Sequence, residues 1–217
     1  MNWHTFRDSL RLSNEAEIHP HVPQESAESF QSIDTETTEI EYLDLLYGVV
    51  RAVKPKAILD TGAHKGYSAI AMGFATRDNS MSGCPSGQVT SVEKSLEYFG
   101  QAAEAVRHAG LSNYVKVRHG DTLTILRDED GARRFDMVYF DSSRACRTAE
   151  FQYLLEKGSL VPRSILAFHD TSPLRKPKSE RDRNVHSKYL RKVKDTAEIC
   201  SEKLIFNLSR GLTIYRL

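Results

Sequence analysis

Residues 57–76 read AILDTGAHKGYSAIAMGFAT, and this stretch decides the fold class of the chain. Ala57–Thr61 is a short apolar run that contains Asp60, and it predicts a buried strand. Gly62–Gly66 is a turn with a glycine at each end, and Tyr67–Thr76 is rich in small residues and predicts a helix. A strand, a turn and a helix in this order are typical of an α/β sheet with crossover helices.

The alternation of strands and helices continues on both sides of this stretch. Thr38–Val53 has apolar residues at helical spacing, and Pro55 follows it as a stop signal. Asp78–Gln88 has the composition of a loop. After it, strands are predicted at Val89–Glu93, Val115–Arg118, Phe135–Phe140 and Ser164–Phe168, and helices at Ser95–Ala109, Thr122–Arg127, Ala149–Lys157 and Asn184–Glu198.

Two apolar runs near the end of the sequence, Lys203–Leu208 and Leu212–Leu217, flank a turn and predict a β-hairpin. Five strands interleaved with helices predict a parallel sheet that is covered on both faces. The sequence therefore predicts an α/β fold: a Rossmann-like, doubly wound, mostly parallel sheet with a C-terminal antiparallel hairpin at its edge.

Length and composition exclude several classes of protein. The 217 residues predict one domain, and 30 basic against 29 acidic residues argue against a general nucleic-acid binder. No apolar run reaches the roughly 20 residues of a membrane span, and the polar N-terminus lacks the apolar core of a signal peptide. Three widely spaced cysteines argue against a disulfide framework or a zinc site, so a cytoplasmic location is expected.

Charge is unevenly distributed along the chain. Residues 1–41 carry nine acidic groups and two arginines, whereas residues 171–194 carry nine lysines and arginines and two acids. Two interpretations stay open. Both segments are solvated surface, or the basic loop faces an anionic ligand or packs near the acidic segment.

Ligands of open α/β sheets bind outside the carboxyl ends of the strands. Each of the five predicted parallel strands ends near a carboxylate: Asp60, Glu93, Asp121, Asp141 and Asp170. A phosphate site would carry glycine, lysine or arginine instead. The turn after the first strand, DTGAHKG, matches neither the dinucleotide fingerprint nor a P-loop.

Each acid has a chemical and a purely structural interpretation. Asp60 could accept hydrogen bonds from an amine or, through water, a hydroxyl, and the glycines beside it could serve the turn alone. Glu93 could accept the hydroxyls of a ribose or be a solvated acid. Asp121 could accept from an adenine amine or cap the helix that begins at Thr122, and the two roles can coexist.

The segments DTGAHKGYS, VTSVE, HGD and FDMVYFD, followed by a strand that ends in HD, occur in the order and spacing of a known family. Over about residues 38–217 the chain resembles class I S-adenosylmethionine-dependent methyltransferases. It is most similar to small-molecule O-methyltransferases of the catechol, caffeoyl-CoA and macrolide-sugar types. The run from Phe140–Asp141 through Leu160–Pro162 to Phe168–Asp170 carries this closer resemblance.

The resemblance implies S-adenosylmethionine as cofactor and assigns roles to the strand-end residues. Those that would line its methionine part are Asp60, Gly62, Ala63 and Gly66, with Ser68 beside the carboxylate. Glu93 would hold the ribose and Asp121 the adenine. Asp141 would face the methionine amine, a metal, or both.

Three positions depart from the family pattern. His64 stands where the first motif has its middle glycine, Arg144 replaces a histidine, and Arg163 replaces a glycine. The resemblance also includes a metal site after the fifth strand, where Asp141, His169 and Asp170 could bind a divalent cation. Oxygen ligands suit magnesium, and a histidine ligand shifts the preference toward manganese, zinc or iron.

His169 and Asp141 are the predicted catalytic residues. His169 has three interpretations: a metal ligand, a general base that takes a proton from a substrate hydroxyl, or a hydrogen-bonded residue that shapes its loop.

Two segments are expected to cover the substrate. Residues 1–37 are predicted to form a substrate-cap or dimerisation segment, and residues 38–217 the S-adenosylmethionine-binding domain. In the loop 171–190, a carboxylate or phosphate on the substrate would be favoured by Arg175, Lys176, Lys178, Arg181 and Arg183.

The sequence thus predicts a cytoplasmic enzyme that methylates a hydroxyl of a small metabolite, with or without a metal. It allows a homodimer without deciding the oligomeric state, and it predicts neither a nucleic-acid nor a membrane partner. N- or C-methylation and a catalytically altered binding protein stay open as alternatives. A nicotinamide-dependent oxidoreductase is a further alternative, against which the missing third glycine counts.

Overall fold

Strand β3 (Ala57–Thr61) lies near the middle of a seven-stranded sheet in the computed structural model, which describes residues 1–128 and 133–217. The strand order is β5-β4-β3-β6-β7-β9-β8. The other strands are β4 (Gln88–Glu93), β5 (Val115–His119), β6 (Phe135–Phe140), β7 (Leu160–His169), β8 (Glu202–Phe206) and β9 (Leu212–Arg216). The first five run parallel, whereas β9 pairs antiparallel with both β7 and β8, as the predicted hairpin requires.

The central strands are buried on both faces of the sheet. Consecutive side chains of a strand point to opposite faces, so each strand contributes to both apolar clusters. In β3, Ile58 packs into one apolar cluster and Leu59 into the other. In β6, Met137 and Tyr139 belong to the first cluster and Phe140 to the second. A continuous apolar run therefore forms a strand here, and the sheet divides two hydrophobic cores.

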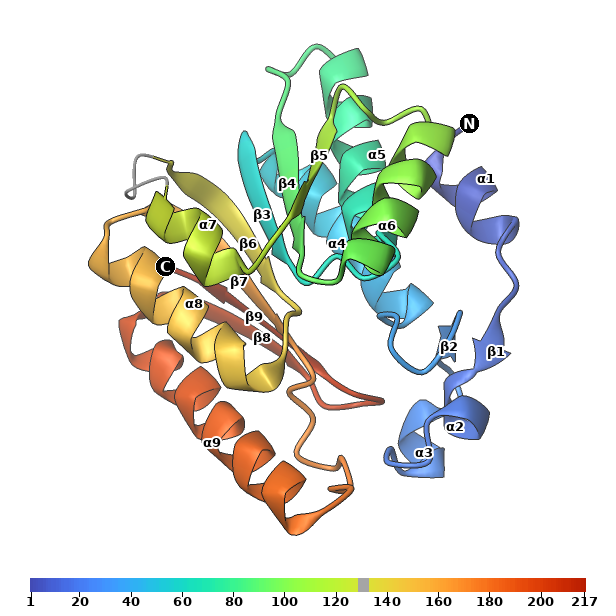
Figure 1. The fold of residues 1–217 in the computed structure, drawn as a ribbon, viewed down its shortest axis with the longest axis vertical. Helices are drawn as coiled ribbons and strands as arrows, with labels where there is room; N and C mark the ends of the chain where they lie inside the picture. Colours follow the sequence, from blue (N-terminus) through green and yellow to red (C-terminus); the bar gives the residue numbers. More distant parts are fainter. Residues whose placement is uncertain (129–132) are drawn as a thin grey trace.

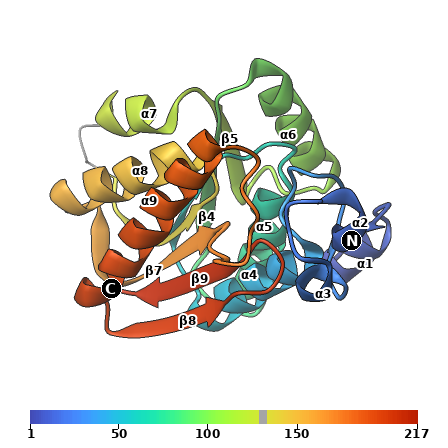
Figure 2. The same cartoon turned by 90° about the horizontal axis from the view of Figure 1, so that it is seen from below.

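Helices cover both faces of the sheet (Figures 1 and 2). The first face carries α4 (Ile40–Val53), α5 (Tyr67–Met81) and α6 (Leu96–His108). The second carries α7 (Thr122–Asp128), α8 (Arg144–Glu156) and α9 (Glu180–Thr196), which the 3-10 turn Ala197–Ile199 follows. This arrangement confirms the predicted doubly wound α/β fold.

Three helices extend beyond their predicted bounds. Helix α5 continues to Met81, into the predicted loop, because the side chain of Asn79 donates to the carbonyl of Val50 and accepts from Arg51. Helix α9 begins at Glu180, where Ser179 caps it by accepting from the backbone of Asp182. Helix α8 begins at Arg144 instead of Ala149, which brings two more arginines into the helix.

The N-terminal segment (residues 1–37) forms short elements of its own: α1 (Trp3–Asp8), β1 (Ser13–Asn14), α2 (Glu15–Ile18), α3 (Gln24–Ala27) and β2 (Gln31–Ser32). Trp3 is fully buried in the core of the first face, and its indole donates to Asp44 on α4 at 2.6 Å. The segment is therefore packed on the domain and continues around it toward the tip of the β8–β9 hairpin (Figure 1). Among the described residues, no helix is long and apolar enough to cross a membrane.

Candidate functional site

A cavity of about 760 Å³ opens at the carboxyl ends of the parallel strands, a size typical of small-molecule sites. Residues that follow each of the five strands line it: Gly62 to Lys65, Glu93 to Ser95, Gly120 to Thr122, Asp141 to Ser143, and His169 with Asp170. The N-terminal segment contributes His19 and Thr35 to Thr37, and the loop before α9 contributes Arg175 and Lys178. Strands that are far apart in the sequence thus meet at one cavity, as predicted.

The two glycines of the first turn have steric reasons to be glycine. Gly62 has a φ of +86°, and a Cβ there would lie 2.6 Å from the carbonyl oxygen of Asp141. Gly66 has a φ of +87° and lies outside the cavity lining, and a Cβ there would lie 3.1 Å from Ala102 on α6. Ala63 is buried at the cavity wall, and its backbone donates to Val92. The turn therefore brings β3, β4 and β6 together around the cavity.

Asp60 is fully buried behind the cavity wall. Its Oδ2 accepts from Ser91 at 2.6 Å and from Ser68, a cavity residue, at 3.0 Å. Burial raises the pKa of Asp60 to about 7, and the hydrogen bonds from the two serines oppose the rise. Within residues 1–128 and 133–217, the other oxygen, Oδ1, has no hydrogen-bond partner. A buried acceptor without a donor is costly, so this atom suits a donor from a ligand.

Glu93 and Asp121 line the cavity but already accept hydrogen bonds from the protein backbone. The two oxygens of Glu93 accept from His64 and Ser95, each at 2.7 Å. Asp121 accepts from the backbone of Thr124 at 3.2 Å, which confirms the predicted helix cap. Each carboxylate oxygen has a second lone pair, so these contacts still leave acceptor capacity for a ligand.

The side chain of His64 is held at the cavity wall. Its φ of 48° lies in the left-handed region, where the family pattern has glycine. The ring lies 4.2 Å from the ring of Tyr98, and its Nε2 is 3.4 Å from a carboxylate oxygen of Glu36. His64 therefore lies between α6 and the N-terminal segment and reduces the open volume of the cavity.

At the cavity wall, His169 joins two carboxylates. Its Nδ1 lies 2.9 Å from Oδ1 of Asp141, and its Nε2 lies 2.8 Å from Oε2 of Glu39, while the side chain is only 1% exposed. Burial alone would lower the pKa of His169, but the charges of Asp141, Glu39 and Asp170 outweigh it and raise the pKa to about 10. The ring is therefore an imidazolium that donates from both nitrogens. To act as a base or a metal ligand, it would have to leave one of these carboxylates.

The cluster around His169 extends to the N-terminal segment through residues that the sequence analysis did not select. Arg210, in the β8–β9 turn, forms ion pairs with Glu15 at 2.9 Å and with Glu39 at 3.1 Å, and it also contacts the carbonyl of Thr37. Arg210 and His169 together lower the pKa of Glu39 far below its usual range, despite its complete burial. Glu39 is therefore a buried carboxylate between two cations.

The three predicted metal ligands lie together but already surround a cation. Side-chain ligand atoms of Asp141, His169 and Asp170 lie within 4.8 Å of one another. Nη2 of Arg147 lies 2.9 Å from Oδ1 of Asp141 and 3.0 Å from Oδ2 of Asp170. With the guanidinium between the carboxylates and His169 bound through both nitrogens, these residues do not fit a divalent cation in this arrangement.

The opposite wall of the cavity is basic. Arg175 and Lys178 line it, whereas the other three predicted bases, Lys176, Arg181 and Arg183, are exposed and lie outside the lining. In the part of the chain that the structure describes, the buried Nε and Nη1 atoms of Arg175 have no hydrogen-bond partner. Burial lowers the pKa of Arg175, and the nearby arginines Arg144 and Arg210 lower it further.

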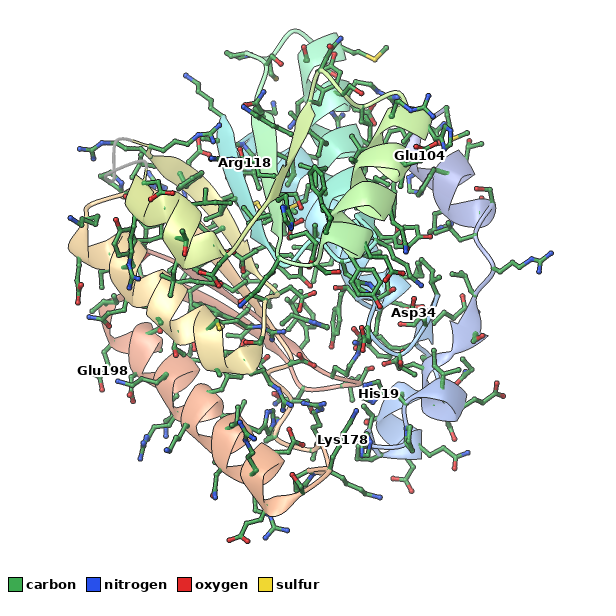
Figure 3. The ribbon with its side chains drawn as sticks, in the orientation of Figure 1. His19, Asp34, Glu104, Arg118, Lys178 and Glu198 are labelled. Atoms are coloured by element: carbon green, nitrogen blue, oxygen red, sulfur yellow. The ribbon has the colours of Figure 1, made fainter. Side chains whose placement is uncertain are left out.

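The basic loop and the acidic N-terminal segment are in contact, as one of the two charge interpretations predicted. The backbone of Lys176 donates to the carbonyl of His21 at 2.6 Å, and Figure 3 shows His19 and Lys178 on these facing segments. Burial lowers the pKa of His19 to about 4, with a further contribution from Arg210 and Arg175. His19 is therefore neutral beside the basic wall.

Comparison with known proteins finds a matching family model and a similar protein. Residues 59–171 match a family model described as a methyltransferase domain. The catechol O-methyltransferase of Niastella koreensis is 30% identical over 135 residues, which is 60% of this chain and 57% of that protein. The match thus spans little more than half of that relative's length.

Solved structures share the fold. The O-methyltransferase of Bacillus cereus in complex with SAH superposes with a TM-score of 0.69 at 18% identity, over 84% of this chain and 83% of that one. The SAH-bound methyltransferase PaMTH1 of Podospora anserina gives 0.67 at 19% identity, over 100% and 96%.

Proposed function

The chain belongs to the methyltransferase-domain family, and we propose that it transfers a methyl group from S-adenosylmethionine to a hydroxyl of a small anionic metabolite. The observation that carries the proposal is that one cavity has a wall at the strand ends, where the acids lie together with Lys65, Lys94 and Arg147, and a wall with Arg175 and Lys178. The first wall suits the amine and hydroxyl groups of the cofactor, and the second suits a carboxylate or phosphate of the substrate.

The wall at the strand ends fits the cofactor in three respects. Behind the wall, the unpartnered Oδ1 of Asp60 could accept from a water that bridges to the cofactor's amine, and Gly62 with Ala63 lets a ligand approach the backbone of the turn. Ser68, near the start of α5, would lie by the cofactor's carboxylate, where helix amides favour an anion. Glu93 and Asp121 keep lone pairs for the ribose and the adenine.

S-adenosylmethionine supplies a methyl group that its sulfonium already activates, so the protein has to align the reactants and exclude water. We propose that the N-terminal segment serves the second task as a cap, because Thr35, Glu36 and Thr37 form part of the cavity wall. Its use for dimerisation stays a prediction.

His169 and Asp141 remain the proposed catalytic pair, but in this arrangement they act by charge. The imidazolium at the cavity wall would favour negative charge on a nearby substrate oxygen; the hydroxyl proton would pass to water while the methyl group leaves the sulfonium for that oxygen. Asp141 fixes the ring and is itself fixed by Thr38 at 2.8 Å. The proposed reaction does not use a metal, because Arg147 lies between the carboxylates of Asp141 and Asp170.

The experiment that tests the proposal is calorimetric titration with S-adenosylhomocysteine (SAH), NAD and NADP, followed by methyl-transfer assays on matched hydroxy acids, neutral alcohols and amines. We expect binding of SAH alone and turnover of hydroxy acids. Binding of a nicotinamide nucleotide instead, or turnover of amines only, would contradict the proposal. SAH binding without turnover of any compound would indicate a binding protein on the same fold.

A further inference from the structure

Arg147, on the second turn of α8, lies where three predicted metal ligands converge. The residue is 3% exposed, and its guanidinium makes four polar contacts. Nη2 lies 2.9 Å from Asp141 and 3.0 Å from Asp170, Nε donates to the carbonyl of Ser142 at 2.6 Å, and Nη1 donates to the carbonyl of His169 at 2.6 Å. Every nitrogen of the guanidinium is thus bound.

The surroundings of Arg147 also fix the plane of its guanidinium. The ring of Tyr189 on α9 lies 5.4 Å from it, and the hydroxyl of Tyr189 donates to the same His169 carbonyl at 2.6 Å. Lysine could not replace arginine here. A planar guanidinium can bridge two carboxylates and stack on an aromatic ring at the same time, and an ammonium group cannot. Arg147 is therefore a rigid part of the site.

We propose that Arg147 replaces a divalent cation in this site, and that methyl transfer by this protein needs no metal. Nη2 of Arg147 binds Oδ1 of Asp141 and Oδ2 of Asp170, so it already uses one oxygen of each carboxylate that a metal would need. A dication could bind there only next to a buried guanidinium, and like charges repel strongly when both are removed from water.

Arg147 acts as a positioning residue. It holds Asp141 in the orientation in which this carboxylate contacts His169 and Thr38, so it sets the geometry of the proposed catalytic pair. The transfer step in this proposal rests on the proposed function, whereas the absence of metal binding can be tested without turnover.

The first test is titration of the wild-type protein, with and without saturating SAH, with Mn²⁺ followed by electron paramagnetic resonance. We expect the spectrum of free Mn²⁺ throughout, and turnover that neither EDTA nor added Mg²⁺ changes. Tight binding of Mn²⁺ that is lost in Asp170→Asn would overturn the inference. If SAH binds but no substrate turns over, the proposed function fails while the Mn²⁺ result still decides the inference.

Two arginines one helical turn apart provide a matched pair of variants. In Arg147→Met, the two carboxylates lose their cation, and we expect the folded variant to gain Mn²⁺ binding and lose methyl-transfer activity. Arg144→Met removes an arginine that pairs with Asp182 instead, and we expect no Mn²⁺ binding. A folded Arg147→Met that binds no Mn²⁺ would show that the guanidinium is not what excludes the metal, and would also overturn the inference.

Discussion

Nε2 of His169 lies 2.8 Å from Oε2 of Glu39, although 130 positions separate the two residues in the sequence. Through this contact and the ion pairs of Arg210 with Glu39 and with Glu15, the N-terminal segment, the end of β7 and the β8–β9 turn share one buried charge cluster. The same side chains therefore hold both the N-terminal segment and the cavity wall at the end of β7. A substitution in one of these parts is expected to change the position of the other.

Glu39→Gln should destabilise the protein strongly. The substitution leaves His169 and Arg210 buried with less negative charge, and loss of one partner from a buried ion pair costs about 3–5 kcal/mol. Chemical denaturation measures the effect. Glu41→Gln, two residues along the chain in α4, is the control, because Glu41 accepts one backbone hydrogen bond near the surface. Equal small losses in the two variants would show that the cluster does not stabilise the fold.

The stability of the protein should decrease as the pH rises from about 4 to about 7 through the contribution of Asp60. In this range the unfolded carboxyl, with a pKa of about 3.9, has lost its proton, whereas the folded one, with a pKa raised to about 7 by burial, still holds it. Each rise in pH therefore favours the unfolded state.

Asp60→Asn removes this contribution, so the melting temperature of the variant minus that of the wild type should become more positive from pH 4 to pH 7. Differential scanning calorimetry of both proteins at matched pH values measures the difference. A difference that stays constant over the range would mean that Asp60 titrates normally in the folded protein.

Arg175→Gln should weaken the binding of anionic substrates. The buried nitrogens of Arg175 gain a partner from an anion, and a hydrogen bond to a charged group is worth about 1.5–3 kcal/mol, or about 10- to 100-fold in KM. Steady-state kinetics with a hydroxy acid and its neutral amide should show a raised KM for the acid only, with SAH affinity unchanged. Arg181→Gln, which removes an exposed base at the start of α9, should leave both values unchanged.

Gly62→Ala should cost stability and abolish SAH binding. A Cβ at Gly62 would meet the backbone of Asp141 at 2.6 Å, in addition to the strain of about 1–2 kcal/mol for a side chain in the left-handed region. Gly110→Ala is the matched control, because Gly110 also has a positive φ but none of the described atoms lies within 4 Å of the position that its added methyl group would take. Denaturation measures the loss of stability from the backbone strain that both variants share. Calorimetry with SAH measures the loss of binding, which we expect only from the clash at Gly62. If the two variants behaved alike, the close approach of the turn to β6 would not matter for binding.

The sheet could be predicted from the sequence because its strands are buried on both faces. A run such as Phe135–Phe140 is apolar throughout apart from Asp136, and a parallel strand between two helical layers requires this. The alternation of strands and helices also shows where each strand ends, so the acids at the strand ends could be predicted. The acidic part of the cavity wall could therefore be predicted as well. The helix ends could not, because α5 is extended by contacts of Asn79 with α4 that composition does not reveal.

The charge cluster could not be predicted, since its members meet only through the tertiary fold. Glu39 lies just before α4 and Arg210 lies in a hairpin turn, and nothing in the sequence relates these two positions to each other. The sequence gives a weak indication of the role of Arg147. Together with Phe151 and Leu154 it has the spacing of a buried helix face, and a charged side chain on such a face needs a partner of opposite charge. The predicted start of the helix at Ala149 concealed that pattern.

Arg210 follows every other member of the buried cluster in the chain, and this order has a consequence for biosynthesis. Glu15 and Glu39 leave the ribosome early, yet the arginine that neutralises them emerges only after β8 has been made. Until then, closure of the N-terminal segment over the sheet would bury two carboxylates without that cation, which is unfavourable. We therefore expect the nascent chain to stay open at the cavity until the β8–β9 hairpin inserts beside β7.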